Sequence, residues 1–179
     1  MPGKLADAKS YAERLFDYHL VGVLSRDEAI DALIEPASGE GVKWSDDAID
    51  VVLDAAGGYP YFLQQFGRDT WNAAGSSPLT VSDARLGLAN GLATLDSGFF
   101  RARWDRATPA ERDYMRAMAE DGDLGSLVSD IATRIGKKVM SLGPARASLI
   151  GKGLIFAPEH GRVAFSVPAM AEFVMRQVS

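Results

Sequence analysis

Helix signals follow one another along this sequence, and strand-type alternation of apolar and polar residues is nearly absent before residue 153. The motif SRDE at residues 25–28 is a capping box, because Ser25 can accept from the backbone N–H of Glu28 and Glu28 can reach back to Ser25. Ser45 is expected to be a second N-cap, since two aspartates follow it in the first turn of the next apolar pattern. The pattern therefore predicts a mainly helical protein.

Three helices of ordinary length are expected in the first part of the chain. The helix after the SRDE motif carries apolar residues on one face and is expected to stop at Pro36. The helix after Ser45 is expected to end at Gly57-Gly58, and the next one to start with Pro60. Proline is tolerated there, because the N–H that it lacks has no partner in the first turn of a helix.

A long fourth helix is expected at about residues 82–106. Gly91 and Gly98 lie within it and weaken it, which would produce a kink or an interruption. Its expected buried positions are Leu88, Leu92, Leu95, Phe99 and Trp104.

The sequence TPAE at residues 108–111 gives the clearest boundary signal in the chain, with Thr108 as the cap, Pro109 as the first helical residue and Glu111 as the box partner. Three helices followed by two strands are predicted after it, which is the order of a winged helix-turn-helix domain. We therefore expect a helical bundle at residues 1–107 and a winged helix at residues 108–179. The segments expected in the second domain are helices at 109–120, 127–135 and about 139–151, a link at 121–125, strands at 153–157 and 162–167, and a helix at 168–177.

The composition excludes several kinds of site. The chain contains no cysteine, which excludes disulfides and thiolate metal sites, and His19 and His160 are too far apart in sequence for metal-ligand spacing. No apolar run reaches the roughly 18 residues of a membrane span, and the N-terminus lacks the apolar core of a signal peptide. We therefore expect a cytoplasmic protein without a metal or a membrane partner.

No catalytic motif is found. The sequence lacks the P-loop pattern G-x-x-x-x-G-K-[ST], the zinc pattern H-E-x-x-H and the nucleophile pattern G-x-S-x-G. Most carboxylates fall at helix starts or on polar faces, where they cap helices or are solvated. The chain is therefore expected to have no catalytic residue and to perform no chemistry alone.

Charge is distributed unevenly over the chain, whose net charge is −5. Residues 1–108 hold ten basic and sixteen acidic residues, a net charge of −6, whereas residues 109–179 hold nine and eight, a net charge of +1. DNA contact is therefore expected only from a local basic face of the second part. The residues expected on that face are Lys137, Lys138, Ser141, Arg146, Lys152, His160 and Arg162.

Protein docking is the alternative for the same surface. Winged helices also serve as docking modules, and a few cations on a nearly neutral domain are a weak footprint for DNA. Gly143-Pro144 lies inside the expected recognition helix and would shorten or distort it.

The stretch GGYPYFLQQFG at residues 57–67 has two interpretations. The abrupt turn between two helices, with aromatic residues around a proline, is typical of a tight corner in a core. A rigid apolar residue without a donor at a helix start also makes a flat surface beside free N–H groups. Such a surface would suit a lid that closes over an adenine ring.

The order of a small helical bundle with GGYPYFLQQFG followed by a winged helix resembles the C-terminal half of AAA+-type ATPases, and more closely the archaeal-ATPase and STAND branch. AKSYAERLF at residues 8–16 is similar to the segment that leaves the nucleotide-binding domain, and the segments up to residue 67 are similar to the lid. Gly58-Tyr59-Pro60 matches the G-x-P motif of STAND lids, in which the proline packs on adenine. Arg14 lies roughly where relatives have a phosphate-sensing arginine, or is a surface arginine of an amphipathic helix.

The P-loop core of that family is missing from this sequence, so ATP or ADP is expected only in an intact parent protein. The resemblance implies a non-catalytic lid and winged-helix part of a regulatory ATPase. Its partners would be a P-loop ATPase domain, DNA or another protein. The alternatives are a free-standing DNA-binding transcription regulator and a protein-interaction adaptor without a ligand.

Overall fold

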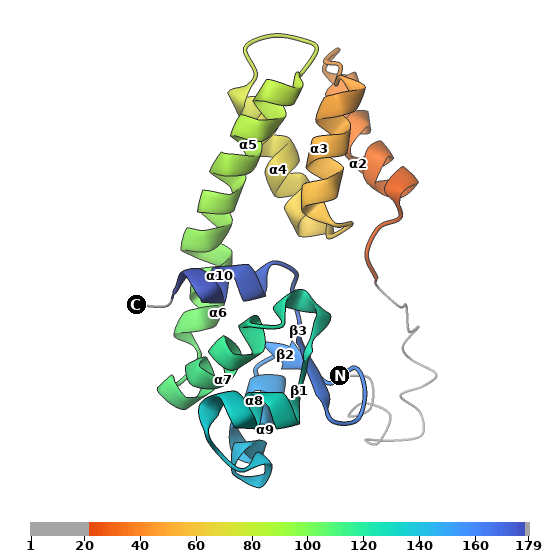
Figure 1. The fold of residues 1–179 in the computed structure, drawn as a ribbon. Coiled ribbons are helices and arrows are strands. Elements are labelled where there is room, and N and C mark those ends of the chain that lie inside the picture. Colours follow the sequence, from red (N-terminus) through yellow and green to blue (C-terminus); the bar gives the residue numbers. More distant parts are fainter. Residues whose placement is uncertain (1–21, 178–179) are drawn as a thin grey trace, which may run out of the picture.

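The computed structural model describes residues 22–177 and confirms a mainly helical fold with a small antiparallel sheet (Figure 1). Four helices form a bundle at one end of the molecule, and the last of them continues as a long rod to the other end. The bundle consists of α2 (Arg26–Gly39), α3 (Asp46–Ala56), α4 (Pro60–Ala73) and α5 (Val81–Thr94), and the rod of α5, the π-helical segment η2 (Leu95–Phe100) and α6 (Arg101–Asp105).

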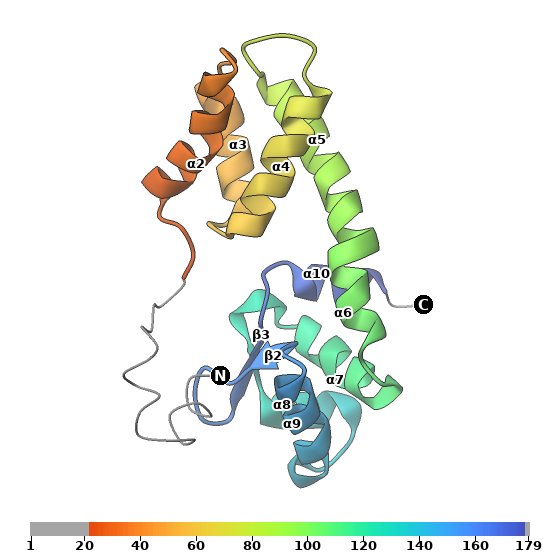
Figure 2. The same ribbon diagram turned by 180° about the vertical axis from the view of Figure 1, so that it is seen from behind.

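The remaining elements form a second unit, here called the C-terminal module, around the lower end of the rod (Figure 2). Its strands pair in the order β1-β3-β2, and both pairings are antiparallel. The module consists of α7 (Pro109–Ala119), η3 (Gly122–Leu124), β1 (Ser126–Leu127), α8 (Val128–Ile135), η4 (Val139–Leu142), α9 (Gly143–Gly151), β2 (Ile155–Phe156), β3 (Arg162–Phe165) and α10 (Met170–Arg176).

The predicted helix starts are confirmed. Ser25 and Glu28 form the expected capping box, as do Thr108 and Glu111, and the Ser45 side chain accepts from the N–H of Ala48. Pro60 and Pro109 lie in the first turns of α4 and α7, as predicted. Local hydrogen bonding decides these positions, which explains why the sequence predicts them well.

One predicted helix end is wrong. The helix that was expected to stop at Pro36 continues to Gly39, with Pro36 inside its last turn. A proline in this place removes one helical hydrogen bond and does not prevent the turn from closing. The N–H groups of Glu40 and Gly41 then donate to Ala37 and Ser38 and end the helix.

The buried face of the long helix also differs from the prediction. Leu95 and Trp104 are buried as expected, but Leu92 is exposed. The face that packs on α4 is instead made of small residues, because a Cβ on Gly87 would lie 2.4 Å from the backbone of Thr70 and one on Gly91 2.6 Å from Phe66. The expected interruption is present as the π-helical segment η2.

The first strand of the sheet was not expected from the sequence. Ser126 and Leu127 pair with Val163 and Arg162, so that the predicted hairpin becomes a three-stranded sheet. A strand of two residues is too short to show an alternation of apolar and polar side chains. It is a strand only because it pairs with β3, which lies about 35 residues away in the sequence. The predicted order of helices and hairpin is otherwise observed.

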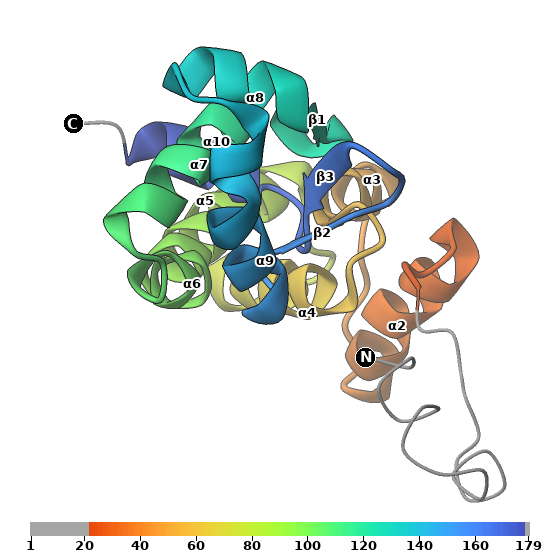
Figure 3. The same ribbon diagram turned by 90° about the horizontal axis from the view of Figure 1, so that it is seen from below.

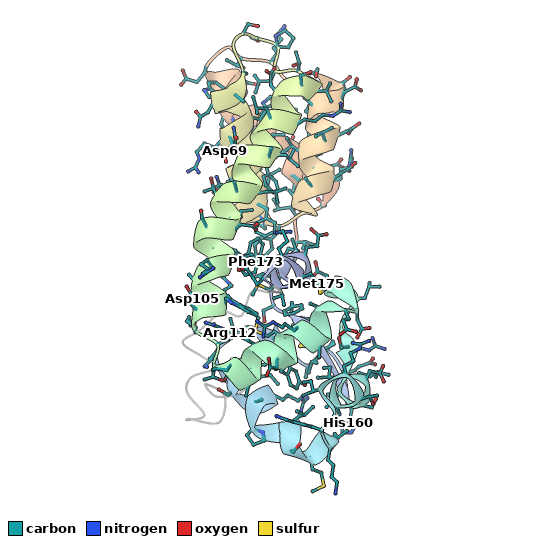
Figure 4. All side chains as sticks on the ribbon, turned by 60° about the vertical axis from the view of Figure 1, so that its left-hand side comes forward. Asp69, Asp105, Arg112, His160, Phe173 and Met175 are labelled. Atoms are coloured by element: carbon teal, nitrogen blue, oxygen red, sulfur yellow. The ribbon has the colours of Figure 1, made fainter. Side chains whose placement is uncertain are left out.

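An aromatic cluster joins the two units. Phe62 of α4 meets Phe99 and Phe100 of η2 in edge contacts, and Phe100 stacks on Phe173 of α10 with the ring centroids 5.4 Å apart. Phe173 also contacts the edge of Trp104. Figure 4 shows Phe173 between the bundle and the module, above the place where Asp105 and Arg112 lie beside each other. The core is therefore continuous through the junction.

Candidate functional site

The predicted adenine-contacting corner opens on a cleft between the two units, here called the junction cleft. One wall is the start of α4 and the other is the segment that leads from β3 to α10. The cleft has a volume of about 690 Å³, and most of its lining is apolar. It is lined by residues 22–23, 59–61 and 165–168 and by Asp123.

Two glycines shape the corner on the bundle side. Gly57 ends α3 in the left-handed conformation, and Gly58 follows with φ of +72°. The N–H of Leu24 donates to the carbonyl of Gly58 over 2.8 Å, and a Cβ on Gly58 would lie 2.7 Å from the carbonyl oxygen of Leu24. Glycine is therefore required here for both the turn and the close approach of residues 22–24.

The three residues predicted to bind nucleotide do not all lie in the cleft. Tyr59 and Pro60 line it, whereas Gly58 lines a separate pocket of about 310 Å³ beside Leu24. Tyr61 was not included in that prediction, yet it lines the cleft with 49% of its surface exposed. Its ring stacks on Phe99 with a centroid distance of 5.0 Å, which holds it at the cleft margin.

The opposite wall is held by an acidic side chain. The carboxylate of Asp123 accepts from the N–H of Ala169 over 2.6 Å and from that of Ala171 over 3.5 Å. Ala169 has a φ of 58°, and no other non-glycine residue described here has a positive φ. Asp123 therefore compensates for a strained backbone at the start of α10 and is the charged residue of the cleft lining.

Arg103 is a functional candidate that the sequence did not indicate. Its guanidinium carbon lies 3.5 Å above the centre of the Phe99 ring, and Nη1 donates to the carbonyl of Phe99 over 2.9 Å. Burial lowers the pKa of Arg103, while the neighbouring Tyr59 and Tyr61 act in the opposite direction. The one available signal was the four-residue spacing from Phe99, which many surface arginines share.

Lys152 does not form part of a free basic face, contrary to the prediction. Its Nζ lies 2.6 Å from the buried carboxylate of Glu111 and donates to the carbonyl of Arg106 over 2.9 Å. Burial alone would raise the pKa of Glu111, but the hydrogen bonds from Lys152 and from Thr108 outweigh it and hold the pKa at about 2. Lys152 thus ties the end of α9 to the start of α7.

Arg162 and Arg146 are also drawn into the module. Arg162 pairs with Glu159 over 2.9 Å and donates to the carbonyl of Gly125 over 3.2 Å. Arg146 is half-buried, and its Nε is enclosed by protein without a hydrogen-bond partner. Arg162 is therefore engaged within the module, and the Nε of Arg146 is removed from solvent.

The other predicted residues of the basic face lie at the surface. Lys137, Lys138 and Ser141 are exposed around η4, where the hydroxyl of Ser141 donates to the carbonyl of Lys138 over 2.7 Å. Met140 between them is 92% exposed. His160 lies in the loop between β2 and β3, at the end of the molecule away from the bundle (Figure 4). The Gly143-Pro144 step divides the predicted helix into η4 and α9, as expected.

A second cavity, of about 360 Å³, lies between α2 and α4 and is away from the predicted site residues. Seen from below, α2 projects to one side of the molecule (Figure 3). Trp44 and Trp71 contribute to the lining of this cavity, and Arg68 is its charged residue. The cavity brings together none of the residues that were predicted to bind nucleotide or DNA.

The remaining predictions concern residues 1–21, which the structure does not describe, and the expected lack of a metal site and of a membrane span. Arg14 and His19 precede residue 22, where the description begins. Among residues 22–177, no cluster of three or more His, Cys, Asp or Glu side chains could hold a metal ion. Within the same range, no helix has both the length and the apolar character needed to cross a membrane.

The chain was compared with known proteins. A family model described as "Domain of unknown function (DUF8462)" matches residues 97–174, which is less than half of the chain. No curated protein sequence matches it. Among solved structures, a mutant of RuvB from Thermotoga maritima is similar, with 12% sequence identity and a TM-score of 0.40. The match covers 89% of this chain and 51% of that one, so the chain spans about half of the RuvB length. A TM-score this low does not establish a shared fold.

Proposed function

We propose that this chain is the lid and winged-helix part of an AAA+/STAND-type ATP-binding protein, with the lid at residues 1–107 and the winged helix at residues 108–179. The junction cleft would take the adenine ring of ATP or ADP. A P-loop domain, located upstream in a longer protein or supplied by a partner, would hold the phosphates and perform any hydrolysis. The role of this chain is then regulatory and non-catalytic.

The observation that supports this proposal is the composition of the cleft walls. Tyr59 and Pro60 face a segment that contains Val167 and Pro168, and neither proline has an N–H to donate. A flat heteroaromatic ring suits apolar walls with an aromatic edge, and the volume of about 690 Å³ falls within the usual range of small-ligand sites. Residues 22–23 also line the cleft.

The position of the cleft between the two units supports a regulatory role. Its walls come from both units, and the aromatic cluster continues from Tyr61 through Phe99 and Phe100 to Phe173. A ligand that contacts both walls stabilises one relative orientation of bundle and module. Ligand binding would thereby be transmitted to the surface of the winged helix.

Saturation-transfer NMR with adenosine tests the adenine site on the full 179-residue chain. We expect transfer to the H2 and H8 protons of the base, and a loss of at least half of that signal in Pro60→Ala. Pro144→Ala is the matched control, because Pro144 also lies in the first turn of a helix but outside the cleft. Equal transfer to parent and Pro60→Ala, or none to either, would contradict the proposal.

For the winged helix, we propose a protein partner with an acidic and apolar surface rather than duplex DNA. Two of the predicted DNA-contacting cations, Lys152 and Arg162, pair with carboxylates within the module, and a third, Arg146, is half-buried. Lys137 and Lys138 lie instead beside Met140, which is 92% exposed. Paired positive charges around an apolar side chain complement an acidic, apolar partner better than a phosphate backbone.

A duplex-DNA titration at two salt concentrations distinguishes a DNA-binding winged helix from one that binds a protein. We expect no affinity tighter than the nonspecific range, about 10⁻⁴ to 10⁻⁶ M, and no change in Lys138→Ala. Tight binding that weakens steeply with salt and is lost in Lys138→Ala would favour the DNA-binding alternative and overturn the docking proposal.

A further inference from the structure

We propose that the cavity between α2 and α4, here called the bundle cavity, is a second ligand site and binds a small planar aromatic carboxylate. It shares no lining residue with the junction cleft. The inference therefore stands independently of the proposed adenine site. It assigns a ligand class to a part of the chain that precedes the family match at residues 97–174.

The first argument is the size of the bundle cavity and the packing of its lining. A volume of about 360 Å³ is at the lower end of the range for small-molecule sites and suits a ligand of one or two rings. Leu33, Ala37 and Leu63 are buried residues of the lining. A Cβ on Gly67 would lie 2.7 Å from Cδ1 of Leu33, so α2 and α4 approach closely there. The cavity therefore has room for one compact molecule between well-packed helices.

The second argument is the pair of indole rings in the lining. The half-buried Trp44 is held in place through its backbone, because the N–H of Leu79 donates to the carbonyl of Lys43 over 2.8 Å and the N–H of Ser45 donates to that of Leu79 over 3.0 Å. Trp71, in the last turn of α4, is 39% exposed. Indole rings pack favourably on other aromatic rings. The lining therefore favours a planar aromatic ligand.

The third argument is the charge of the bundle cavity. Its lining contains Arg68 and no carboxylate, although residues 1–108 carry a net charge of −6. Nε of Arg68 lies 3.7 Å from Asp69, which is too far for a hydrogen bond, and Asp69 accepts instead from Gln65 over 2.6 Å. Arg68 takes part in no hydrogen bond within residues 22–177. Its donors are therefore available for the paired hydrogen bonds that a carboxylate accepts from an arginine.

The fourth argument is the spacing of polar and aromatic groups along α4. Gln64, Arg68 and Trp71 follow one another at intervals of four and three residues, so they share one face of the helix. A ring that packs on Trp71 would bring its carboxylate beside Arg68. The indole N–H of Trp44 also has no acceptor within residues 22–177. The side chains of the lining thus carry more donors than acceptors, which suits an anion.

NMR of the isotopically labelled full chain, titrated with trans-cinnamate, tests the inference. The chain has three tryptophans, and their indole N–H signals are assigned with single Trp→Phe variants. We expect the signals of Trp44 and Trp71 to shift and that of Trp104 to stay, because Trp104 does not line the cavity. The neutral trans-cinnamamide should bind about tenfold more weakly, the difference typical of charge-assisted hydrogen bonds.

Substitutions of Arg68 separate its charge from the shape of the cavity. In Arg68→Gln, the affinity for cinnamate should fall to that for cinnamamide, whose own affinity is unchanged. Arg68→Lys should keep part of the preference, because it keeps the charge and loses the fork of donors. Arg85→Gln is the matched control, since Arg85 is an exposed arginine of the bundle helix α5 outside the lining, and should keep the full preference.

Removal of the indole in Trp71→Leu should weaken both ligands, because it removes part of the apolar wall. Thermal unfolding followed by circular dichroism identifies any variant that has lost its fold. If Trp71→Leu has lost it, the Arg68 variants carry the comparison, because the exposed side chain of Arg68 makes no hydrogen bond within residues 22–177 whose loss would destabilise the helix.

The outcomes also distinguish this inference from the proposed adenine site. Pro60→Ala should leave the cinnamate shifts unchanged, and their loss in that variant would place the ligand in the junction cleft and refute the inference. Unshifted Trp44 and Trp71 signals in the parent would refute it as well. Equal affinities for cinnamate and cinnamamide, or a preference that Arg68→Gln leaves intact, would refute the carboxylate contact.

Discussion

The bundle and the C-terminal module are held together by different forces. In the bundle, α4 and α5 approach closely over Gly87 and Gly91, and the core beneath them is mainly apolar. The ion pairs of the bundle, such as that of Arg26 with Asp54, lie at the surface. In the module, a buried carboxylate pairs with Lys152, and Arg134 binds both oxygens of Asp121 over 2.6 Å.

In the second unit, part of the positive charge counted from the sequence is therefore used for contacts within the module. Lys152 and Arg162, which the sequence counted toward a DNA-binding face, connect α9 and β3 to the rest of the module, and Arg134 connects α8. Arg103 of α6, in the rod below the bundle, pairs with no carboxylate within residues 22–177. A charged side chain has functional meaning only after its internal partners are known.

The largest expected effect is the loss of Lys152. In Lys152→Met, the buried carboxylate of Glu111 remains without its cation, and we expect the free energy of unfolding to fall by about 3–5 kcal/mol. Urea unfolding measures the loss, and hydrogen exchange should rise in α7 and α9 before it rises in α4. Lys138→Met is the control, since Lys138 is exposed, and should change stability by less than about 0.5 kcal/mol. Equal losses in the two variants would contradict the contrast between the units.

Acid should weaken the module through the same pair. Because the pKa of Glu111 is depressed from 4.5 to about 2, its contribution is fully present above pH 4.5 and is lost as the pH falls toward 2. The expected loss from this residue is about 3 kcal/mol. Urea unfolding of the parent between pH 6 and pH 2.5 measures it. Glu111→Gln should show a shallower dependence on pH, and an unchanged slope would count against the assignment.

A smaller loss is expected in the bundle from Gly87→Ala. The added Cβ would lie 2.4 Å from the backbone of Thr70, so α4 and α5 must separate, at a cost of about 2 kcal/mol. Gly98→Ala is the matched control within the same rod, because a Cβ there meets nothing within 4 Å. That control should be neutral or stabilising by up to about 1 kcal/mol. Thermal unfolding measures the stability of both variants. A loss of stability in Gly98→Ala would contradict the packing argument.

The smallest effect is expected at the junction. In Phe173→Leu, the stacking on Phe100 and the edge contact with Trp104 are lost while most of the apolar volume remains. We expect a loss of about 1 kcal/mol, the low end for two aromatic pairs. Hydrogen exchange should rise in η2 and α10 together. A rise confined to α10 would show that the cluster does not couple the two units.

Local patterns predicted the helix starts and the mainly helical class with a small hairpin. Thr108 and Glu111 form their capping box from neighbouring atoms, so the sequence contains the whole interaction. Leu92 was misplaced for the opposite reason. The long helix buries the face on which α4 packs, and α4 packs closely on the face that carries Gly87 and Gly91, because these residues have no side chain. A prediction from hydrophobicity alone places Leu92 on the buried face.

The candidate site was predicted in part. Gly58-Tyr59-Pro60 led to the corner, because a double glycine before a proline is a local signal for a turn and a helix start. Tyr61 and Asp123 were missed, since the cleft that they line is formed by segments far apart in the sequence. The internal partners of the predicted basic face were not foreseen, because ion pairs such as that between Lys152 and Glu111 join residues about 40 positions apart.

The sequence by itself determined the capped helices, the glycine-proline corner and the order of elements, since each is fixed by interactions within a few residues. Only the tertiary structure decided which cations remain free, which face of the long helix is buried and where the cleft lies. Those properties depend on which distant groups meet, and a buried charge or a close backbone approach is favourable or costly only through that partner.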